Sequence, residues 1–411
     1  MKKYLEQNVY DAAVERINFI FDHFEKVCVS FSGGKDSTVL LHLTHQIATE
    51  RNRLPIYILF VDLEGQYNCT IEHIHEMLEL PGIIPYWICL PLNLRNAVSV
   101  FEPHWVCWDE TKKDLWVREL PDHPSVISDQ NYFPFFRYRM EFEDFVPAFQ
   151  EWLAEDDSTA CLVGIRADES LNRYRAIVRL RESRFQGKGW TNTNCKGSVT
   201  ACYPIYDWRT EDIWAYIGKE KLKYNRLYDF MYLTGKSIHE MRICQPYGDD
   251  QRKGLDQFHQ IEPETWFRIV QRVSGANMGN IYCGQKMLGY HRGLGLPKGH
   301  TWESYTKLLL STMPPKTRNH FEQKYAVYID WWKKHGYEEK KIPDHANRKD
   351  EAAKKVPSWR RMCLCILKND FWCKSLSFSM TKELYEKYYK KVESGEFVSK
   401  LDLIKEKYKD I

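Results

Sequence analysis

The stretch VCVSFSGGKDSTVLLHL, residues 27–43, decides the fold of the chain. It starts with a short apolar run, 27–29, of the kind that forms a buried strand, and it leads into an apolar, helix-forming run, 38–47. A strand that turns through glycines into a helix gathers several backbone N–H groups around one point, at the positive end of the helix dipole. The stretch therefore predicts a binding loop for a pyrophosphate group.

The side chains between this strand and this helix suit the same ligand. Two adjacent glycines let the backbone approach an anion that any Cβ would keep away. Hydroxyl groups add hydrogen-bond donors, and one lysine adds a positive charge. The nucleotide-binding residues expected in the loop are Ser30, Ser32, Gly33, Gly34, Lys35, Asp36, Ser37 and Thr38.

The loop differs from the Walker A motif, G-x-x-x-x-G-K-[ST]. Its glycines are adjacent, and an aspartate, Asp36, follows the lysine directly. The string SxSGGKDST resembles the PP-loop of the adenosine-nucleotide alpha-hydrolase group, which includes N-type ATP pyrophosphatases, ATP sulfurylase small subunits and PAPS reductases. A plain glycine turn between a buried strand and a helix is the alternative, and the match of the whole string in a strand–helix context argues against it.

A second apolar run, from Pro55 to Asp62, predicts a parallel strand that is covered on both faces. With the helix before it, this strand completes a βαβ unit with a right-handed crossover. Ligands of such sheets bind at the carboxyl ends of the strands. Asp62 and Glu64 follow the second strand, so we expect them on the same side of the sheet as the loop.

Two further motifs follow along the chain, in the same order as in the PAPS reductase branch. The run GIRADESLNRYR, residues 164–175, follows an apolar strand, 160–165, and resembles the GxR-x-x-[EQ]-S-x-x-R motif of the PAPS reductase branch. The run YPIYDW, residues 203–208, resembles the P-[IL]-x-x-W segment of that branch. Arginine clamps phosphate through paired hydrogen bonds, so Gly164, Arg166 and Arg173 join the expected nucleotide-binding residues.

The region after residue 225 departs from ordinary PAPS reductases. The run RICQPYGDDQRKGLDQF, residues 242–258, and the run that follows it resemble the IbrA (immunoglobulin-binding regulator A) subgroup. The loop 247–254 carries two acids, two bases and two glycines. It can hold a phosphate, bind a metal or cover the pocket, and a solvated turn between helices is an equal alternative.

These observations predict an α/β fold with a Rossmann-like parallel five-stranded sheet and a mainly helical C-terminal region. We expect the PP-loop nucleotide-binding domain within residues 1–225 and a helical IbrA-type region within residues 226–340. Residues 341–411 are expected to form a linker and a small helical tail. An aromatic insertion after residue 90 is expected to pack against the sheet edge.

A nucleotide triphosphate normally shares its charge with Mg²⁺, so a metal is expected with ATP. Asp36 and Asp62 are the candidates to hold it, and Asp62 also counts among the expected nucleotide-binding residues. Asp36 can instead cap the following helix, a frequent role of aspartate at a helix start. Glu64 can contact the ribose or face water.

No iron–sulfur cluster is expected, because the paired cysteines that hold one in the related APS reductases are absent. The Glu-Cys-Gly segment that carries the PAPS reductase nucleophile is absent as well. Cys363, Cys365 and Cys373, like Cys195 and Cys202, do not match the usual spacing of zinc ligands. We interpret them as buried small hydrophobic residues.

Composition excludes several classes of protein. A net charge of +3 over 411 residues does not mark a general nucleic-acid binder. The basic run Arg173, Arg175, Arg179, Arg181, Arg184 and Lys188 is a local exception, and for most of it a solvated surface is the favoured interpretation over nucleic-acid contact. No apolar run is long enough to span a membrane, the N-terminus lacks the features of a secretory signal, and twelve scattered cysteines suit the cytoplasm.

The favoured function is that of an ATP alpha-hydrolase, which transfers or releases AMP with pyrophosphate as leaving group. Lys35, Asp36 and Arg166 are the expected catalytic residues, and the bound ligand is ATP or PAPS. One alternative is thiol-dependent PAPS reduction, a step of sulfur metabolism. The IbrA resemblance implies another, a nucleotide-binding regulator that acts with a ParB-like partner of the IbrB type. The acceptor and the oligomeric state stay open at this point.

Overall fold

The computed structural model describes residues 6–96, 98–99, 102, 104–170, 173–174, 177, 183–194, 197–243, 255–276, 296–313, 315–337, 341–368, 370 and 373–376. The chain divides into two compact units. The first contains residues 1–97 and 104–280, and the second contains residues 98–103 and 281–411. The region 226–276, which the sequence assigns to a second domain, thus belongs to the same unit as the nucleotide-binding sheet.

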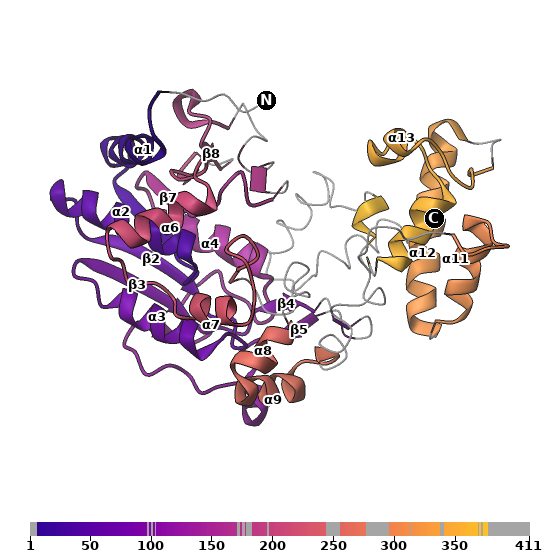
Figure 1. Ribbon diagram of the computed structural model, residues 1–411, viewed down its shortest axis with the longest axis horizontal. Coiled ribbons are helices and arrows are strands. Elements are labelled where there is room, and N and C mark those ends of the chain that lie inside the picture. The colour runs from indigo at the N-terminus through magenta and orange to yellow at the C-terminus, as the bar shows by residue number, and fades with distance from the viewer. Residues whose placement is uncertain are drawn as a thin grey trace. The chain divides into compact units, whose positions relative to one another are not determined.

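A seven-stranded sheet in the order β6-β3-β2-β1-β7-β9-β8 forms the centre of the first unit (Figure 1). All neighbouring strands are parallel except β8 and β9. The strands are β1 (Lys26–Ser30), β2 (Ile56–Val61), β3 (Ile83–Ile88), β6 (Val126–Ile127), β7 (Thr159–Val163), β8 (Thr191–Thr193) and β9 (Val199–Cys202). The predicted α/β class is confirmed, with seven strands in place of five. The two edge strands, β6 and β8, are too short to give a sequence pattern.

Central strands are buried on both faces, which explains their unbroken apolar sequences. In β1 the side chains of Val27, Cys28 and Val29 are all buried. β1 pairs with β2 on one side and with β7 on the other. Since β1 is central, the loop that follows it lies at the middle of the carboxyl edge of the sheet.

The sheet is accompanied by the helices of the first unit. They are α1 (Val9–His23), α2 (Lys35–Glu50), α3 (Asn68–Leu78), α4 (Phe142–Ala154), α6 (Thr210–Lys219), α7 (Leu227–Leu233), α8 (Leu255–Ile261) and α9 (Pro263–Arg272). Asn8 caps the first turn of α1 by accepting a hydrogen bond from the backbone N–H of Asp11. Its buried residues recur at helical spacing and face the core.

The aromatic insertion contains a two-stranded antiparallel sheet, β4 (Asn93–Arg95) and β5 (His104–Val106), and a 3₁₀ helix, η1 (Glu110–Leu115). Trp108 and Trp116 of this insertion are buried. The indole of Trp108 donates a hydrogen bond of 2.9 Å to the carbonyl of Asp62, at the end of β2. The insertion thus covers the carboxyl end of β2.

The second unit is helical in its described part. It contains α11 (Trp302–Ser311), α12 (Pro315–Trp332), a π-helical turn η5 (Lys333–Tyr337), α13 (Arg348–Ala352), α14 (Trp359–Leu367) and a 3₁₀ turn η6 (Lys374–Leu376). Its core gathers apolar residues of these elements: Leu310, Phe321, Tyr325, Tyr328, Met362, Cys365, Cys373 and Leu376. The closing part of the expected helical tail, 377–411, lies outside the described residues. None of the described helices combines the length and the apolar character needed to span a membrane.

Candidate functional site

A cavity of about 490 Å³ lies at the carboxyl ends of β1 and β7. The chain runs outward from β1 to β2 and β3 on one side and returns to β7 on the other, so this is the switch point of the sheet, where α/β folds bind ligands. The described lining residues are Ser30, Ser32, Gly34, Lys35, Asp36, Ser37, Phe142, Val146, Gln150, Val163, Gly164, Ile165, Arg166, Asp168, Glu169, Arg173, Thr210, Tyr228, His239, Met241, Arg242 and Ile243. The structure thus brings the PP-loop and both predicted arginines to one cavity.

The two glycines of the loop have different roles. Gly33 has a φ of +72°, and a Cβ there would lie 2.9 Å from Cδ1 of Ile74 and 3.0 Å from Cγ2 of Thr70. Packing against α3 therefore requires a glycine at position 33. This corrects the sequence-based explanation, in which Gly33 lets the backbone approach an anion. Gly34 lines the cavity, where a Cβ would stand 3.4 Å from the Tyr228 hydroxyl, so the explanation by an approaching anion stays a prediction for Gly34 alone.

Hydroxyl groups of the loop mainly fix its shape. The side chains of Ser37 and Thr38 each donate a hydrogen bond of 3.0 Å to the carbonyl of Gly34. Thr38 is buried and also bonds His73 at 2.9 Å, so it supports the loop from behind. Ser30, Ser32 and Ser37 line the cavity.

The Asp36 carboxylate contacts two cations, Lys35 of the loop and Arg166 after β7. Arg166 forms an ion pair with Asp36, and the Lys35 Nζ lies 3.3 Å from the other oxygen of the same carboxylate. Lys35 and Arg166 are only 4% and 3% exposed. The helix-cap alternative for Asp36 has no support here, since the N-cap residue of α2 is Gly34 and the Asp36 carboxylate pairs with Arg166 and Lys35.

Gly164 is required by close packing. A Cβ at this position would stand 3.0 Å from the backbone nitrogen of Ser37 and 3.1 Å from the carbonyl carbon of Asp36. Backbone atoms cannot yield as a flexible side chain can. Gly164 therefore sets how closely β7 approaches the first turn of α2.

Residues far along the chain complete the cavity, and local sequence patterns do not reveal them. The Tyr228 hydroxyl accepts a hydrogen bond of 3.0 Å from the backbone N–H of Lys35. The carbonyl of Met241 accepts one of 3.4 Å from the Lys35 ammonium, and the Arg242 guanidinium donates to the carbonyl of Glu169. The polar loop expected at 247–254 lies outside the described residues.

The basic run is only partly described. Arg173 lines the cavity, about half exposed, at 3.7 Å from the Glu169 carboxylate. The ammonium of Lys188 lies over the ring of Phe19 at 4.7 Å from its centre. Arg175, Arg179 and Arg181 lie outside the described residues.

Asp62 is placed away from the cavity. It is fully buried, accepts a hydrogen bond of 2.8 Å from the indole of Trp87 and forms an ion pair with Arg118. The backbone N–H of Glu64 donates a further bond of 3.0 Å to it. Because Asp62 is fully buried and is not part of the cavity wall, it is not available to a metal in the cavity, and this corrects the expectation for the pair Asp36 and Asp62.

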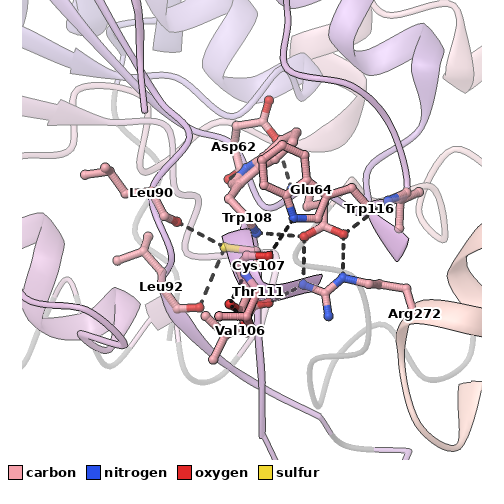
Figure 2. Close-up of polar contacts among 12 residues, drawn as sticks. Asp62, Glu64, Leu90, Leu92, Val106, Cys107, Trp108, Thr111, Trp116 and Arg272 are labelled. Carbon is pink, nitrogen blue, oxygen red and sulfur yellow. Dashed lines mark hydrogen bonds and ion pairs between the residues drawn. The ribbon is translucent and has the colours of Figure 1, made fainter. Parts of the chain in front are cut away.

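Glu64 forms the centre of a sealed network (Figure 2). Its carboxylate accepts hydrogen bonds from the backbone N–H of Trp108 at 2.7 Å and of Val117 at 3.1 Å. The guanidinium of Arg272 donates two more, from Nε at 2.8 Å and from Nη2 at 3.1 Å. Burial raises the pKa of Glu64, and the hydrogen bonds and charge of Arg272 oppose the shift. Glu64 therefore faces neither water nor the cavity.

Within the described part of the chain, no group of three or more histidine, cysteine, aspartate or glutamate side chains has the arrangement of a metal site. Cys363, Cys365 and Cys373 are buried in the second unit, and Cys202 is buried in β9. Burial raises the pKa of the Cys363 thiol to about 11. Cys195 lies outside the described residues.

Family models and a relative match this chain. The phosphoadenosine phosphosulfate reductase domain matches residues 26–83 and 130–234, and a domain of unknown function, DUF3440, matches residues 235–345 and 338–387. The chain is 41% identical over 394 residues to the uncharacterized protein YbdN of Escherichia coli K12, covering 94% of this chain and 95% of that one.

More distant similarities cover about half of the chain. Sulfate adenylyltransferase subunit 2 of Mycolicibacterium vanbaalenii is 25% identical over 229 residues, which are 53% of this chain and 62% of the relative. The crystal structure of a phosphoadenylyl-sulfate reductase from Candida auris aligns with a TM-score of 0.31 and 14% identity, over 57% of this chain and 95% of that one.

Proposed function

Since the chain belongs to the PAPS reductase-like family of the PP-loop adenine nucleotide alpha-hydrolase superfamily, we propose that it binds ATP in the cavity beside the PP-loop and cleaves it at the α-phosphate. AMP is transferred to an acceptor or to water, and pyrophosphate leaves. The observation that carries the proposal is the ion-paired group Lys35, Asp36 and Arg166 at the start of α2, in the wall of a nucleotide-sized cavity.

In the proposed reaction an acceptor oxygen forms a bond to the α-phosphorus. The bond from that phosphorus to the bridging oxygen breaks, and the oxygen leaves with the electron pair as pyrophosphate. Negative charge grows on the leaving group, where Lys35 and Arg166 neutralise it. Asp36 positions both cations, and Arg173 closes the cavity from the opposite side. Catalysis consists mainly of positioning and electrostatic stabilisation.

The Asp36 carboxylate in the cavity wall can bind a magnesium ion together with the nucleotide. Mg²⁺ usually takes one or two carboxylates, and the phosphates of the nucleotide and water supply the remaining ligands. Asp36 is the residue for this role, because Asp62 is enclosed behind β2. When bound, the ion would neutralise phosphate charge.

Binding and turnover test the proposal separately. Thermal shift with pyrophosphate, ATP and PAPS measures binding, and pyrophosphate release with Mg-ATP measures turnover. Lys35→Met keeps the length of the side chain and removes its charge, so we expect at least a ten-fold loss of pyrophosphate affinity. Lys307→Met, on the exposed surface of α11, is the matched control and leaves affinity unchanged. Absence of any shift with ATP and of pyrophosphate release would refute the proposal.

PAPS reduction is the second candidate, supported by the match to the PAPS reductase domain. It needs a reactive thiolate. Burial raises the pKa of the Cys363 thiol to about 11, which keeps that thiol protonated at neutral pH and disfavours Cys363 as the nucleophile. Sulfite formed from PAPS with thioredoxin would favour this candidate over ATP cleavage, and its loss in a Cys363→Ser, Cys365→Ser or Cys373→Ser variant would locate the nucleophile.

A nucleotide-binding regulator with a ParB-like partner is the third candidate. The Lys35 amide bonds Tyr228, just before the DUF3440-matching part of the chain, and the Lys35 ammonium bonds the carbonyl of Met241, within that part. Such contacts can transmit nucleotide binding without turnover. Tight ATP binding with no product, together with a change in partner affinity on adding ATP, is the result expected of a regulator.

A further inference from the structure

Charge is distributed unevenly between the two units of the chain. The first unit contains 32 lysines and arginines and 39 acidic residues, which gives a formal net charge of −7. The second unit contains 27 lysines and arginines and 17 acidic residues, which gives +10. The net charge of +3 for the whole chain conceals this difference. A strongly basic part of a nearly neutral chain indicates a polyanionic partner.

A basic surface of the second unit lies on and beside α13, within residues 341–355, and is called the α13 surface below. It contains five cationic residues, and all five are exposed: Lys341, Arg348, Lys349, Lys354 and Lys355. Lys341, Lys349 and Lys355 form no ion pair with another described residue. Their charges therefore remain open to a ligand from solution.

Acidic residues of the same segment are turned to internal contacts. Glu351 is buried, and its carboxylate accepts hydrogen bonds of 2.6 Å from the Ser358 hydroxyl and 2.7 Å from the Arg360 guanidinium. The Asp344 carboxylate accepts a hydrogen bond of 2.9 Å from the backbone N–H of Glu303, at the start of α11. The segment thus directs two of its three carboxylates inward and all of its cations outward, which leaves the α13 surface positive.

Backbone hydrogen bonds fix the segment against α14. The carbonyl of Pro343 accepts a bond of 3.0 Å from the backbone N–H of Trp359, in the first turn of that helix. The backbone N–H of Ala346 donates a bond of 2.9 Å to the Glu351 carboxylate. A cationic surface on a fixed backbone loses less conformational entropy on binding than the same cations on a free chain.

The composition of the α13 surface favours a duplex over other polyanions. Lysine and arginine bind phosphates of either a single or a double strand. Residues 341–355 contain no phenylalanine, tyrosine or tryptophan, so they offer no ring on which unpaired bases could stack. Ile342, the one large apolar residue between Lys341 and Lys355, packs on the core of the second unit, so no apolar side chain is left to enter a lipid surface.

We propose that the α13 surface binds the phosphate backbone of a double-stranded nucleic acid without reading its sequence. The inference does not rest on the proposed nucleotide binding, because the PP-loop belongs to the other unit. Each cation that contacts a phosphate releases about one counterion, so the affinity falls as the salt concentration rises. Removal of such cations lowers the steepness of this dependence.

Fluorescence anisotropy of a labelled DNA duplex of random sequence, mixed with the full chain, tests the proposal. We expect binding whose affinity falls steeply between about 50 and 200 mM salt. Lys341→Gln/Lys349→Gln/Lys355→Gln should bind the duplex at least ten-fold more weakly, with the slope of log K against log salt reduced by about 2–3.

A matched variant separates the α13 surface from net charge. Lys112→Gln/Lys219→Gln/Lys221→Gln removes the same charge from exposed positions of the first unit, and its affinity for the duplex should stay within about two-fold of the wild type. Thermal shift with ATP should be the same in both triple variants as in the wild type. An unchanged ATP shift shows that a loss of duplex binding does not come from unfolding.

Several results would overturn the inference. They are the absence of duplex binding by the wild type at about 50 mM salt, and an equal loss in the two triple variants, which would assign binding to net charge. Tighter binding of the corresponding single strand, or of vesicles that contain an acidic phospholipid, would also overturn it, because the partner would then be of another kind. The proposed cleavage of ATP stands or falls separately, since it is measured with another ligand.

Discussion

The buried pair Glu64 and Arg272 offers a quantitative test of what holds the region after residue 225 to the nucleotide-binding sheet. Arg272→Met removes the charge and the two hydrogen bonds of the guanidinium and keeps much of the apolar volume. The Glu64 carboxylate, fully buried, then has no opposing charge from this partner. Removing one member of a buried ion pair costs about 3–5 kcal/mol.

The same pair predicts strong coupling between two substitutions. Glu64→Gln puts an amide N–H group where the carboxylate accepts bonds from Trp108, Val117 and Arg272, so donor meets donor. In the double variant Glu64→Gln/Arg272→Met no buried charge of the pair is left unpaired. We expect the loss in free energy of unfolding in the double variant to be about 2 kcal/mol smaller than the sum of the losses in the two single variants.

Unfolding in urea, followed by tryptophan fluorescence, gives the free energies of the four proteins. The exposed pair Glu303 and Lys307, one helical turn apart on α11, is the control and should show a coupling below about 0.5 kcal/mol. A loss under about 1 kcal/mol in Arg272→Met, or additivity of the two substitutions, would refute the account of a sealed charge pair.

Three further predictions concern the PP-loop and its support. Gly164→Ala should destabilise the protein by about 1–3 kcal/mol and weaken ATP binding, because the new Cβ meets the backbone of Ser37 at 3.0 Å; equal thermal stability and affinity would contradict this. Tyr228→Phe keeps the ring over the Lys35 ammonium and removes the acceptor for its backbone N–H, so thermal unfolding should show a loss of about 1 kcal/mol, and an unchanged melting temperature would argue against this cap. Burial lowers the pKa of His73 from 6.5 to about 4, so as the pH falls the unfolded chain takes up a proton at this residue before the folded chain does. The free energy of unfolding therefore decreases between these two pH values, by about 2 kcal/mol at pH 5. In His73→Gln this part of the pH dependence should disappear from urea unfolding curves, and its persistence would assign it to other groups.

The sequence by itself determined the strand, loop and helix around Ser32–Ser37 and the parallel α/β class. These features depend on neighbouring residues: an unbroken apolar run suits a strand covered on both faces, and adjacent glycines before a helix start leave backbone donors at its N-terminus. The arginine after β7 was found the same way, since Arg166 follows an apolar strand and a glycine. The structure places it beside Asp36.

Only the tertiary structure decided which of these residues face the cavity and what supports them. Tyr228 bonds the Lys35 amide across 193 residues of chain, and Arg272 reaches Glu64 across 208. Asp62 and Glu64 follow β2 as predicted, but Trp108 and Arg118 of the insertion enclose them. A local pattern states that a polar residue ends a strand; what that residue meets depends on contacts between distant segments, and these exist only once the chain has folded.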